Sequence, residues 1–199
     1  KARKNSQGFD LSNRKVVGEL KDAIDGSSNL YGTVKEANLQ DLEVALKTAA
    51  SHWELWDLTP AQKRAEILNR AADLMEERRG LFLGLLIKEG KKTLQDAVSE
   101  LREAVDYCRY YAAESLKHFH VPQSLQGPTG EQNELVLRGR GTFACISPWN
   151  FPLAIFTGQV AAALAAGNAV VAKPSTLTPL IAFHAIQVLH EAGVPKEVL

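Results

Sequence analysis

The sequence predicts an α/β protein in which an N-terminal helical segment is followed by an incomplete Rossmann-like parallel βαβ sheet. In residues 36–130, apolar side chains recur at the three- and four-residue spacing of amphipathic helices. From residue 142 onward, short β-prone runs alternate with longer runs of small apolar residues. Charge divides the chain in a similar way: residues 1–100 hold 16 basic and 16 acidic side chains, whereas residues 141–190 hold only Lys173. The second region is therefore expected to be buried, as a parallel sheet covered by helices would be.

The composition is typical of a soluble globular chain and argues against several function classes. The 23 Lys and Arg balance 23 Asp and Glu among 199 residues, so no net charge attracts a nucleic acid or an anionic membrane. No apolar run reaches the about 18 residues of a membrane span, and the polar N-terminus does not resemble a signal peptide. Two cysteines cannot build a disulfide framework, which favours a cytoplasmic location. Since the chain begins at Lys1 and its one methionine is Met75, we interpret it as an excerpt of a longer protein.

Residues 1–35 are predicted to form an irregular N-terminal arm, because they are polar and rich in turn-forming residues. Residues 36–130 form the predicted helical part, and its first helix begins at Leu39. One face of that helix is apolar and is predicted to be buried, consisting of Leu42, Ala45, Leu46, Ala49, Trp53 and Trp56.

A second helix is predicted over residues 60–79, with Thr59 as part of a capping box and Gly80 as its stop. An apolar helical stretch follows over residues 81–88. Thr93 is then predicted to cap a long helix whose apolar face includes Cys108. That position favours a buried, unreactive thiol over a nucleophile.

The rest of the chain is predicted to alternate between strands and helices. A loop over residues 122–130 leads into a strand segment at residues 131–141, in which Leu135, Val136 and Leu137 are the strand residues. The first βαβ units then occupy residues 142–199, with strands at 142–146 and 169–172 and helices at 153–166 and 178–193, the last capped by Thr178 and Pro179.

The candidate site lies where these two parallel strands end, because ligands bind outside the carboxyl ends of strands in open α/β sheets. The two loops concerned are residues 147–151 and 173–176. A loose glycine pattern at Gly139 and Gly141 precedes its strand instead of following one, so it is not a dinucleotide fingerprint. Any cofactor bound here is therefore not held by a glycine-rich cradle.

Three residues of this region have both a functional and a structural interpretation. The Asn150 amide can stabilise an oxyanion without titrating, or it can cap the following helix with Pro152 at the first helical position. Lys173 either extends into water or donates to a ligand hydroxyl or phosphate. Cys145 lies mid-strand with no neighbouring base, which favours packing over reactivity. The histidines have no spacing that predicts a shared metal ion.

Two stretches carry a resemblance to a known family. The sequences Ile-Ser-Pro-Trp-Asn-Phe-Pro at 146–152 and Gly-Asn-Ala-Val-Val-Ala-Lys-Pro-Ser at 167–175 resemble the aldehyde dehydrogenase superfamily. Residues 5–11, 64–76 and 102–112 resemble more narrowly the aldehyde dehydrogenase half of bacterial bifunctional proline utilization A enzymes. The resemblance covers essentially the whole chain, which corresponds to less than half of such a domain.

The resemblance implies an NAD-dependent oxidation of L-glutamate γ-semialdehyde, the hydrolysed form of 1-pyrroline-5-carboxylate, to glutamate. Asn150 would hold the oxyanion and Phe151 would wall the aldehyde pocket. Lys173 would bind the adenosine ribose. The cofactor-binding set implied by the motif match comprises Ile146, Ser147, Pro148, Trp149, Lys173, Ser175 and Thr176. The nucleophilic cysteine and the general-base glutamate would follow Leu199, so this fragment alone is predicted to be inactive.

The resemblance also bears on cofactors and partners. Many NAD-using relatives have a glutamate three residues after the lysine, where this chain has Thr176, so NADP use is also expected. FAD is expected only if a proline dehydrogenase domain is attached outside this chain. Leu135 to Leu137 resemble a strand that relatives use in oligomer contacts, which implies a homo-oligomer. The alternatives are a non-catalytic cofactor-binding or oligomerisation module and an aldehyde dehydrogenase of other specificity.

Overall fold

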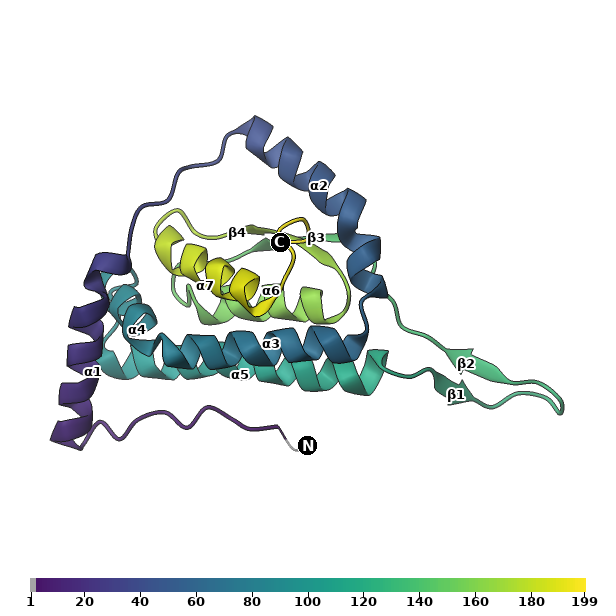
Figure 1. The fold of residues 1–199 in the computed structure, drawn as a ribbon, viewed down its shortest axis with the longest axis horizontal. Helices are drawn as coiled ribbons and strands as arrows, with labels where there is room; N and C mark the ends of the chain where they lie inside the picture. The colour runs from purple at the N-terminus through teal and green to yellow at the C-terminus, as the bar shows by residue number, and fades with distance from the viewer. Residues whose placement is uncertain (1–2) are drawn as a thin grey trace.

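The computed structural model describes residues 3–199, so Lys1 and Ala2 of the predicted arm lie outside the described residues. Figure 1 shows the long helices α3 and α5 side by side, with α6 and α7 between them and a small sheet, and α2 on the other side of that sheet. The helices and strands are α1 (Arg14–Ser27), the 3-10 helix η1 (Ser28–Leu30), α2 (Leu39–Leu58), α3 (Ala61–Glu77), α4 (Arg79–Lys88), α5 (Leu94–Phe119), β1 (Gln123–Leu125), β2 (Asn133–Leu135), β3 (Thr142–Ile146), α6 (Ala154–Ala165), β4 (Ala169–Lys173) and α7 (Pro179–Ala192).

The prediction of an irregular arm over residues 1–35 is wrong for its second half, which contains α1. Asn13 caps this helix by accepting a hydrogen bond from the Lys15 amide at 3.0 Å. Leu20 is buried, and α1 packs against α4. The approach is close at Gly80, where an added Cβ would lie 2.3 Å from the carbonyl oxygen of Ala23. Gly80 therefore serves helix packing inside α4 and does not end the preceding helix as predicted.

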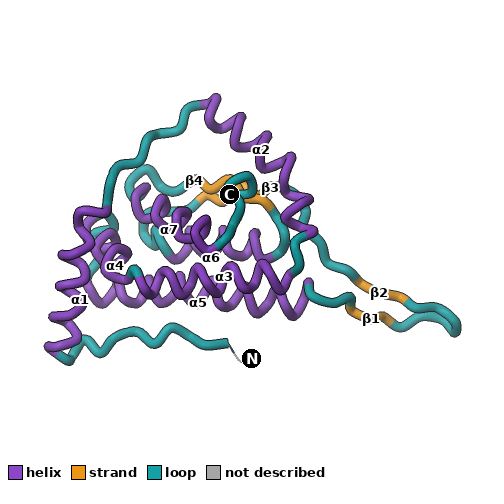
Figure 2. Tube along the Cα trace, viewed as in Figure 1, coloured by secondary structure: helices purple, strands orange, loops and turns teal. Residues whose placement is uncertain are grey.

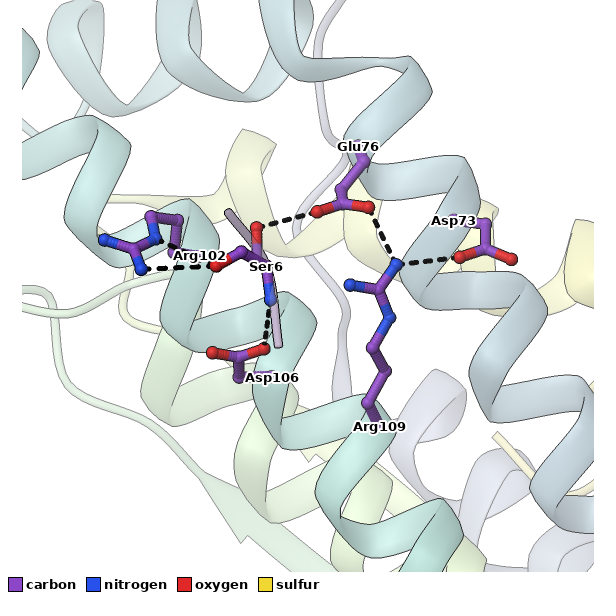
Figure 3. A network of polar contacts seen from close by, with 6 residues as sticks. All are labelled: Ser6, Asp73, Glu76, Arg102, Asp106 and Arg109. Carbon is purple, nitrogen blue, oxygen red and sulfur yellow. Dashed lines mark hydrogen bonds and ion pairs between the residues drawn. The ribbon is translucent and has the colours of Figure 1, made fainter. Parts of the chain in front are cut away.

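Residues 3–13 form no helix or strand and run beside α3 and α5 (Figure 1). Ser6 fixes this segment there (Figure 3): its amide donates to Asp106 at 2.7 Å, its hydroxyl donates to Glu76 at 2.7 Å, and its carbonyl accepts from Arg102. Arg109 joins the same cluster by pairing with Glu76 at 2.7 Å. A segment without secondary structure is therefore held by charged groups on two helices.

Helix α2 forms where predicted, but most of its apolar face is not buried. Ala49 and Trp56 are buried, whereas Leu42 and Leu46 are 43% and 44% exposed. The indole of Trp56 donates to the carbonyl oxygen of Leu164 at 3.0 Å, which ties the C-terminal end of α2 to α6.

The two predicted caps in the helical part have different outcomes. The capping box at Thr59 is wrong, because the Thr59 hydroxyl donates to the carbonyl oxygen of Leu55 in the preceding helix. The cap at Thr93 is confirmed, since its hydroxyl accepts from the amide of Asp96 at 3.2 Å at the start of α5.

A β-hairpin connects α5 to the sheet, and Figure 2 shows it extending away from the body of the molecule. Its strands β1 and β2 pair antiparallel, with Ser124 opposite Glu134. The predicted loop at residues 122–130 therefore contains a strand, and the predicted strand at residues 135–137 lies mostly beyond the end of β2. Antiparallel pairing satisfies the backbone of this polar segment although none of the β1 side chains is buried.

The parallel βαβ arrangement is confirmed. Strands β3 and β4 pair in parallel from Thr142 opposite Ala169 to Ile146 opposite Lys173. Helix α6 connects them and packs on both. Burial is uneven, because β4 begins with buried Ala169 and Val170 whereas Cys145 is the one buried residue of β3. The sheet thus has a protected strand and an open one among the described residues.

Candidate functional site

The carboxyl ends of β3 and β4 lie at one edge of the sheet, as the parallel prediction required. Ile146 pairs with Lys173, and the amide of Ser147 continues the ladder by donating to the carbonyl oxygen of Lys173 at 3.1 Å. The loops that follow, residues 147–153 and 174–178, therefore start side by side. We call the edge formed by residues 147–151 and 173–176 the rim.

Asn150 does not cap the helix that follows it, so the capping interpretation is wrong. Leu153 precedes the first residue of α6, and the first amides of that helix are satisfied by a side chain from elsewhere. Asn150 is exposed, and its side chain makes no hydrogen bond within the described residues. Its two N–H donors thus remain available at the rim.

Glu100 of α5 provides the cap, and sequence reasoning missed it. Its Oε1 atom accepts from the amides of Leu153 and Ala154 at 2.8 and 3.2 Å. The carboxylate is fully buried, and its negative charge interacts favourably with the positive, N-terminal end of the α6 dipole. A signal was present, because Glu100 lies three residues after Ala97 and four before Ala104 on the apolar face of α5.

Lys92 compensates the buried carboxylate and also contacts the rim. Its ammonium lies 2.9 Å from Glu100 Oε2, an atom that accepts no well-directed hydrogen bond in the described chain. The same ammonium lies 4.2 Å from the ring centroid of Phe151. Removing one member of such a buried ion pair typically costs about 3–5 kcal/mol. The loop that carries Asn150 is therefore tied to the helical part by a charged pair.

The aromatic residues beside Asn150 are not core residues in this chain. Trp149 and Phe151 are 58% and 42% exposed, although each would be expected to pack inside a protein. Ile146 is 65% exposed, and Pro148 is also exposed. Ser147 differs from them: it is buried, and its hydroxyl donates to Gln159 at 3.2 Å. The first loop therefore presents a largely apolar surface with one amide in it.

The end of β4 and the loop after it supply a free cation and two hydroxyls. Lys173 is exposed, and its ammonium has no ion-pair partner among residues 3–199. The Ser175 hydroxyl accepts from the Leu177 amide at 3.2 Å, and Thr176 is exposed. The rim has no carboxylate, imidazole or thiol, so it can donate hydrogen bonds to a ligand but offers neither a base nor a strong nucleophile.

The predicted start of α7 is confirmed, because Pro179 is at its first position directly after the cap residue Thr178, but the predicted cap by the side chain of Thr178 is wrong. Its side chain makes no capping hydrogen bond, and its buried hydroxyl has no partner in the described chain. Glu89 instead accepts from the amides of Leu180 and Ile181, both at 3.0 Å. Carboxylates of the helical part thus occupy the N-terminal ends of both α6 and α7, positions where a phosphate could otherwise bind.

Both cysteines lie in environments that oppose reactivity. Cys108 is completely buried, and this burial raises the pKa of its thiol to about 12. Burial also raises the pKa of Cys145. A nucleophile requires the thiolate, which neither residue forms readily near neutral pH.

Comparison with known proteins gives this geometry a family. Residues 19–199 match the sequence model of the aldehyde dehydrogenase family. This chain belongs to that family. It is 45% identical over 186 residues, 92% of its length, to the bifunctional protein PutA of Escherichia coli. The family fold class predicted from the motifs is thereby confirmed.

Solved aldehyde dehydrogenase family structures agree with this fold. Proline utilization A from Bradyrhizobium japonicum superposes with a TM-score of 0.93 at 49% identity over 99% of the chain. A 1-pyrroline-5-carboxylate dehydrogenase from Thermus, solved with bound NAD, gives a TM-score of 0.92 at 26% identity over the whole chain. The chain spans only part of these proteins: 13% of the Escherichia coli protein, 20% of the Bradyrhizobium chain and 44% of the Thermus chain.

Within the described part of the chain, no helix combines the length and hydropathy that a bilayer span requires. The same residues contain no group of three or more His, Cys, Asp or Glu side chains placed to hold a metal ion.

Proposed function

We propose that this sequence is part of an NAD-dependent aldehyde dehydrogenase that oxidises L-glutamate γ-semialdehyde to glutamate. The observation that carries the proposal is the rim, where the unused amide of Asn150 and the free ammonium of Lys173 follow paired parallel strands. The names of its relatives, which include proline utilization A and 1-pyrroline-5-carboxylate dehydrogenase, support the choice of substrate.

The residues of the rim fit a dinucleotide. Lys173 would donate to the ribose hydroxyls, with Ser175 and Thr176 beside it, while the backbone of residues 146–149 would line the cofactor channel. Because Glu89 and Glu100 already fill the ends of α7 and α6, the pyrophosphate would not bind there. When bound, NAD would supply the hydride acceptor.

Asn150 would act on the aldehyde by charge stabilisation. As the carbonyl oxygen gains negative charge, the amide N–H groups would donate to it and lower the barrier. Phe151, held beside Lys92, would wall the pocket against water. The described residues provide no nucleophile for the carbonyl carbon, so we place the nucleophilic cysteine and the general-base glutamate after Leu199 in the complete protein.

We also propose that the complete protein is a homo-oligomer that uses the hairpin. Leu125 and Leu135 are 46% and 45% exposed on its strands, and Val136 and Leu137 continue the apolar surface at 53% and 42% exposure. Paired strands with exposed apolar side chains are typical of surfaces covered by a second chain. A proline dehydrogenase domain with FAD would be a separate part of the complete protein.

The test is turnover of the complete protein that carries this sequence, assayed with the semialdehyde and NAD. Replacing Asn150 with Ala should lower kcat by about 100-fold to 1000-fold, because one oxyanion donor is lost. The dissociation constant of NAD should stay nearly unchanged. Asn69→Ala, at an exposed position of α3, is the matched control and should keep normal turnover.

Two outcomes would contradict this proposal. Normal turnover of Asn150→Ala would remove Asn150 from the mechanism. NAD binding without oxidation of the semialdehyde by the complete wild-type protein would favour the non-catalytic module.

A further inference from the structure

The loop that carries Asn150 is fixed at both ends by different parts of the molecule. At its start, the Ser147 amide donates to β4 and its hydroxyl donates to Gln159 of α6. At its end, the amides of Leu153 and Ala154 donate to Glu100 of α5. Since the Asn150 side chain makes no hydrogen bond of its own within the described chain, the path of this loop decides where its amide lies.

Glu100 holds the end of this loop from a buried position. Its side chain is fully buried, 53 residues before Leu153 in the sequence, and one oxygen serves both loop amides. A carboxylate buried away from water requires a compensating charge, and Lys92 lies 2.9 Å from its second oxygen. The Lys92 side chain is 13% exposed, so little solvent competes for its ammonium.

Lys92 adds a contact that helix capping alone does not need. Its ammonium sits 4.2 Å from the ring centroid of Phe151, the residue directly after Asn150. One pair of opposite charges thus holds the loop at two places just after Asn150: through the Phe151 ring and through the first amides of α6. A displacement of either partner would shift this part of the loop and, with it, the neighbouring Asn150 amide.

We propose that Lys92 and Glu100 form a positioning pair that sets the Asn150 amide at the distance and angle an oxyanion requires. This inference rests on the proposed function of Asn150. The pair touches neither substrate nor cofactor and acts through the loop. Misplacing a catalytic group by about 1 Å can cost about 100-fold in rate, so a pair remote from the chemistry can control turnover.

The test is a double-mutant cycle on kcat in the complete enzyme. Glu100→Gln alone should lower kcat by about 10-fold to 100-fold, because the charge that orders Lys92 is lost while an amide acceptor remains. In an Asn150→Ala background, the same change should alter kcat less than threefold. Residues that act through one group show such non-additive effects, whereas a general loss of stability would not.

Lys92 supplies a second, independent arm of the cycle should Glu100→Gln fail to fold. Lys92→Met removes the cation but keeps the length of the side chain, and it should show the same coupling to Asn150→Ala. Lys92→Arg keeps the charge and should recover most of the turnover. Glu76→Gln is the matched control: this carboxylate of α3 also joins distant segments by charged hydrogen bonds, but it contacts no residue of the loop.

The outcomes separate the two proposals. If Asn150→Ala retains normal turnover, the proposed function fails and the positioning role fails with it. If Asn150→Ala is slow but Glu100→Gln and Lys92→Met reduce kcat equally in both backgrounds, the positioning role alone is overturned. Coupled losses, with the affinity for NAD unchanged, are the expected result.

Discussion

Thr176 is a single residue whose side chain should influence the choice of cofactor. It lies exposed at the rim, three residues after Lys173. A carboxylate at this place would accept the ribose hydroxyls of NAD and repel the 2′-phosphate of NADP. The threonine does neither, so we expect measurable activity with NADP in the complete enzyme.

Thr176→Glu tests this expectation. The variant should raise the ratio of kcat/KM for NAD to that for NADP by about tenfold. This ratio corresponds to about 1.4 kcal/mol of added discrimination between the two cofactors. Thr176→Gln introduces a side chain of the same size as glutamate but without the charge, so it should change the ratio much less. An unchanged ratio in Thr176→Glu would contradict this role.

Single residues also show where burial decides chemistry. Glu100 and Arg64 are buried charges in the helical part. Glu100 accepts a hydrogen bond from a backbone amide at the start of α6, and Arg64 donates one to a backbone carbonyl at its end. Burial lowers the pKa of the Arg64 guanidinium, which nevertheless stays a cation because arginine titrates so far above neutral pH. Each of these charges is therefore explained by a helix terminus and not by a ligand.

At the scale of elements, α6 is held at both ends by side chains of the helical part. The Glu100 carboxylate accepts from its first amides, while Trp56 and Arg64 donate to the carbonyl oxygens of Leu164 and Ala165 at 3.0 and 3.1 Å. A negative group at the N-terminus and a positive group at the C-terminus both favour the helix dipole. The helix after β3 thus has its position set by α2, α3 and α5.

Helix α7 offers a direct comparison between a local and a tertiary cap. Glu89→Ala should destabilise the first turn of α7 by about 0.5–2 kcal/mol, because two amides lose their acceptor. Thr178→Val should change it by less than about 0.5 kcal/mol, since the Thr178 hydroxyl has no partner in the described chain. Hydrogen exchange of the amides of residues 180–183 in the complete protein measures both. A larger loss in Thr178→Val than in Glu89→Ala would reverse the assignment.

At the scale of the whole molecule, the cluster around Ser6 joins the N-terminal arm to α3 and α5 (Figure 3). Burial alone would raise the pKa of Glu76, but the hydrogen bonds from Arg109 and Ser6 outweigh it and lower that pKa below its usual range. A carboxylate with a lowered pKa contributes stability that is present above its unfolded pKa, about 4.3, and lost as the pH falls through its folded pKa. Acid should therefore release the arm.

Hydrogen exchange of the amides of residues 5–9, corrected for intrinsic rates, should show this release as the pH is lowered from 6 to 3. Glu76→Gln should make these amides exchange faster at neutral pH and reduce the acid-dependent step. Glu131→Gln, in the exposed turn of the hairpin, is the control and should leave both unchanged. An acid step of unchanged size in Glu76→Gln would contradict this role of Glu76.

Sequence alone determined the order of the helices from α2 to α7, the parallel strands β3 and β4, and the rim where these strands end. These features follow from local periodicity and from the motifs around Asn150 and Lys173, which need no knowledge of distant residues. The helix α1 escaped prediction although Val16, Leu20 and Ile24 share one face, because turn-forming residues surround them.

Only the tertiary structure decided which side chains complete these elements. The caps of α6 and α7 come from Glu100 and Glu89, 53 and 91 residues before the amides they accept, while the nearby Asn150 and Thr178 do not cap. A periodic pattern reports which face of a helix is buried, but it carries no information about which distant residue packs there. The physical reason is that a hydrogen bond or ion pair depends on distance in space, which the folded chain sets and the spacing along the sequence does not.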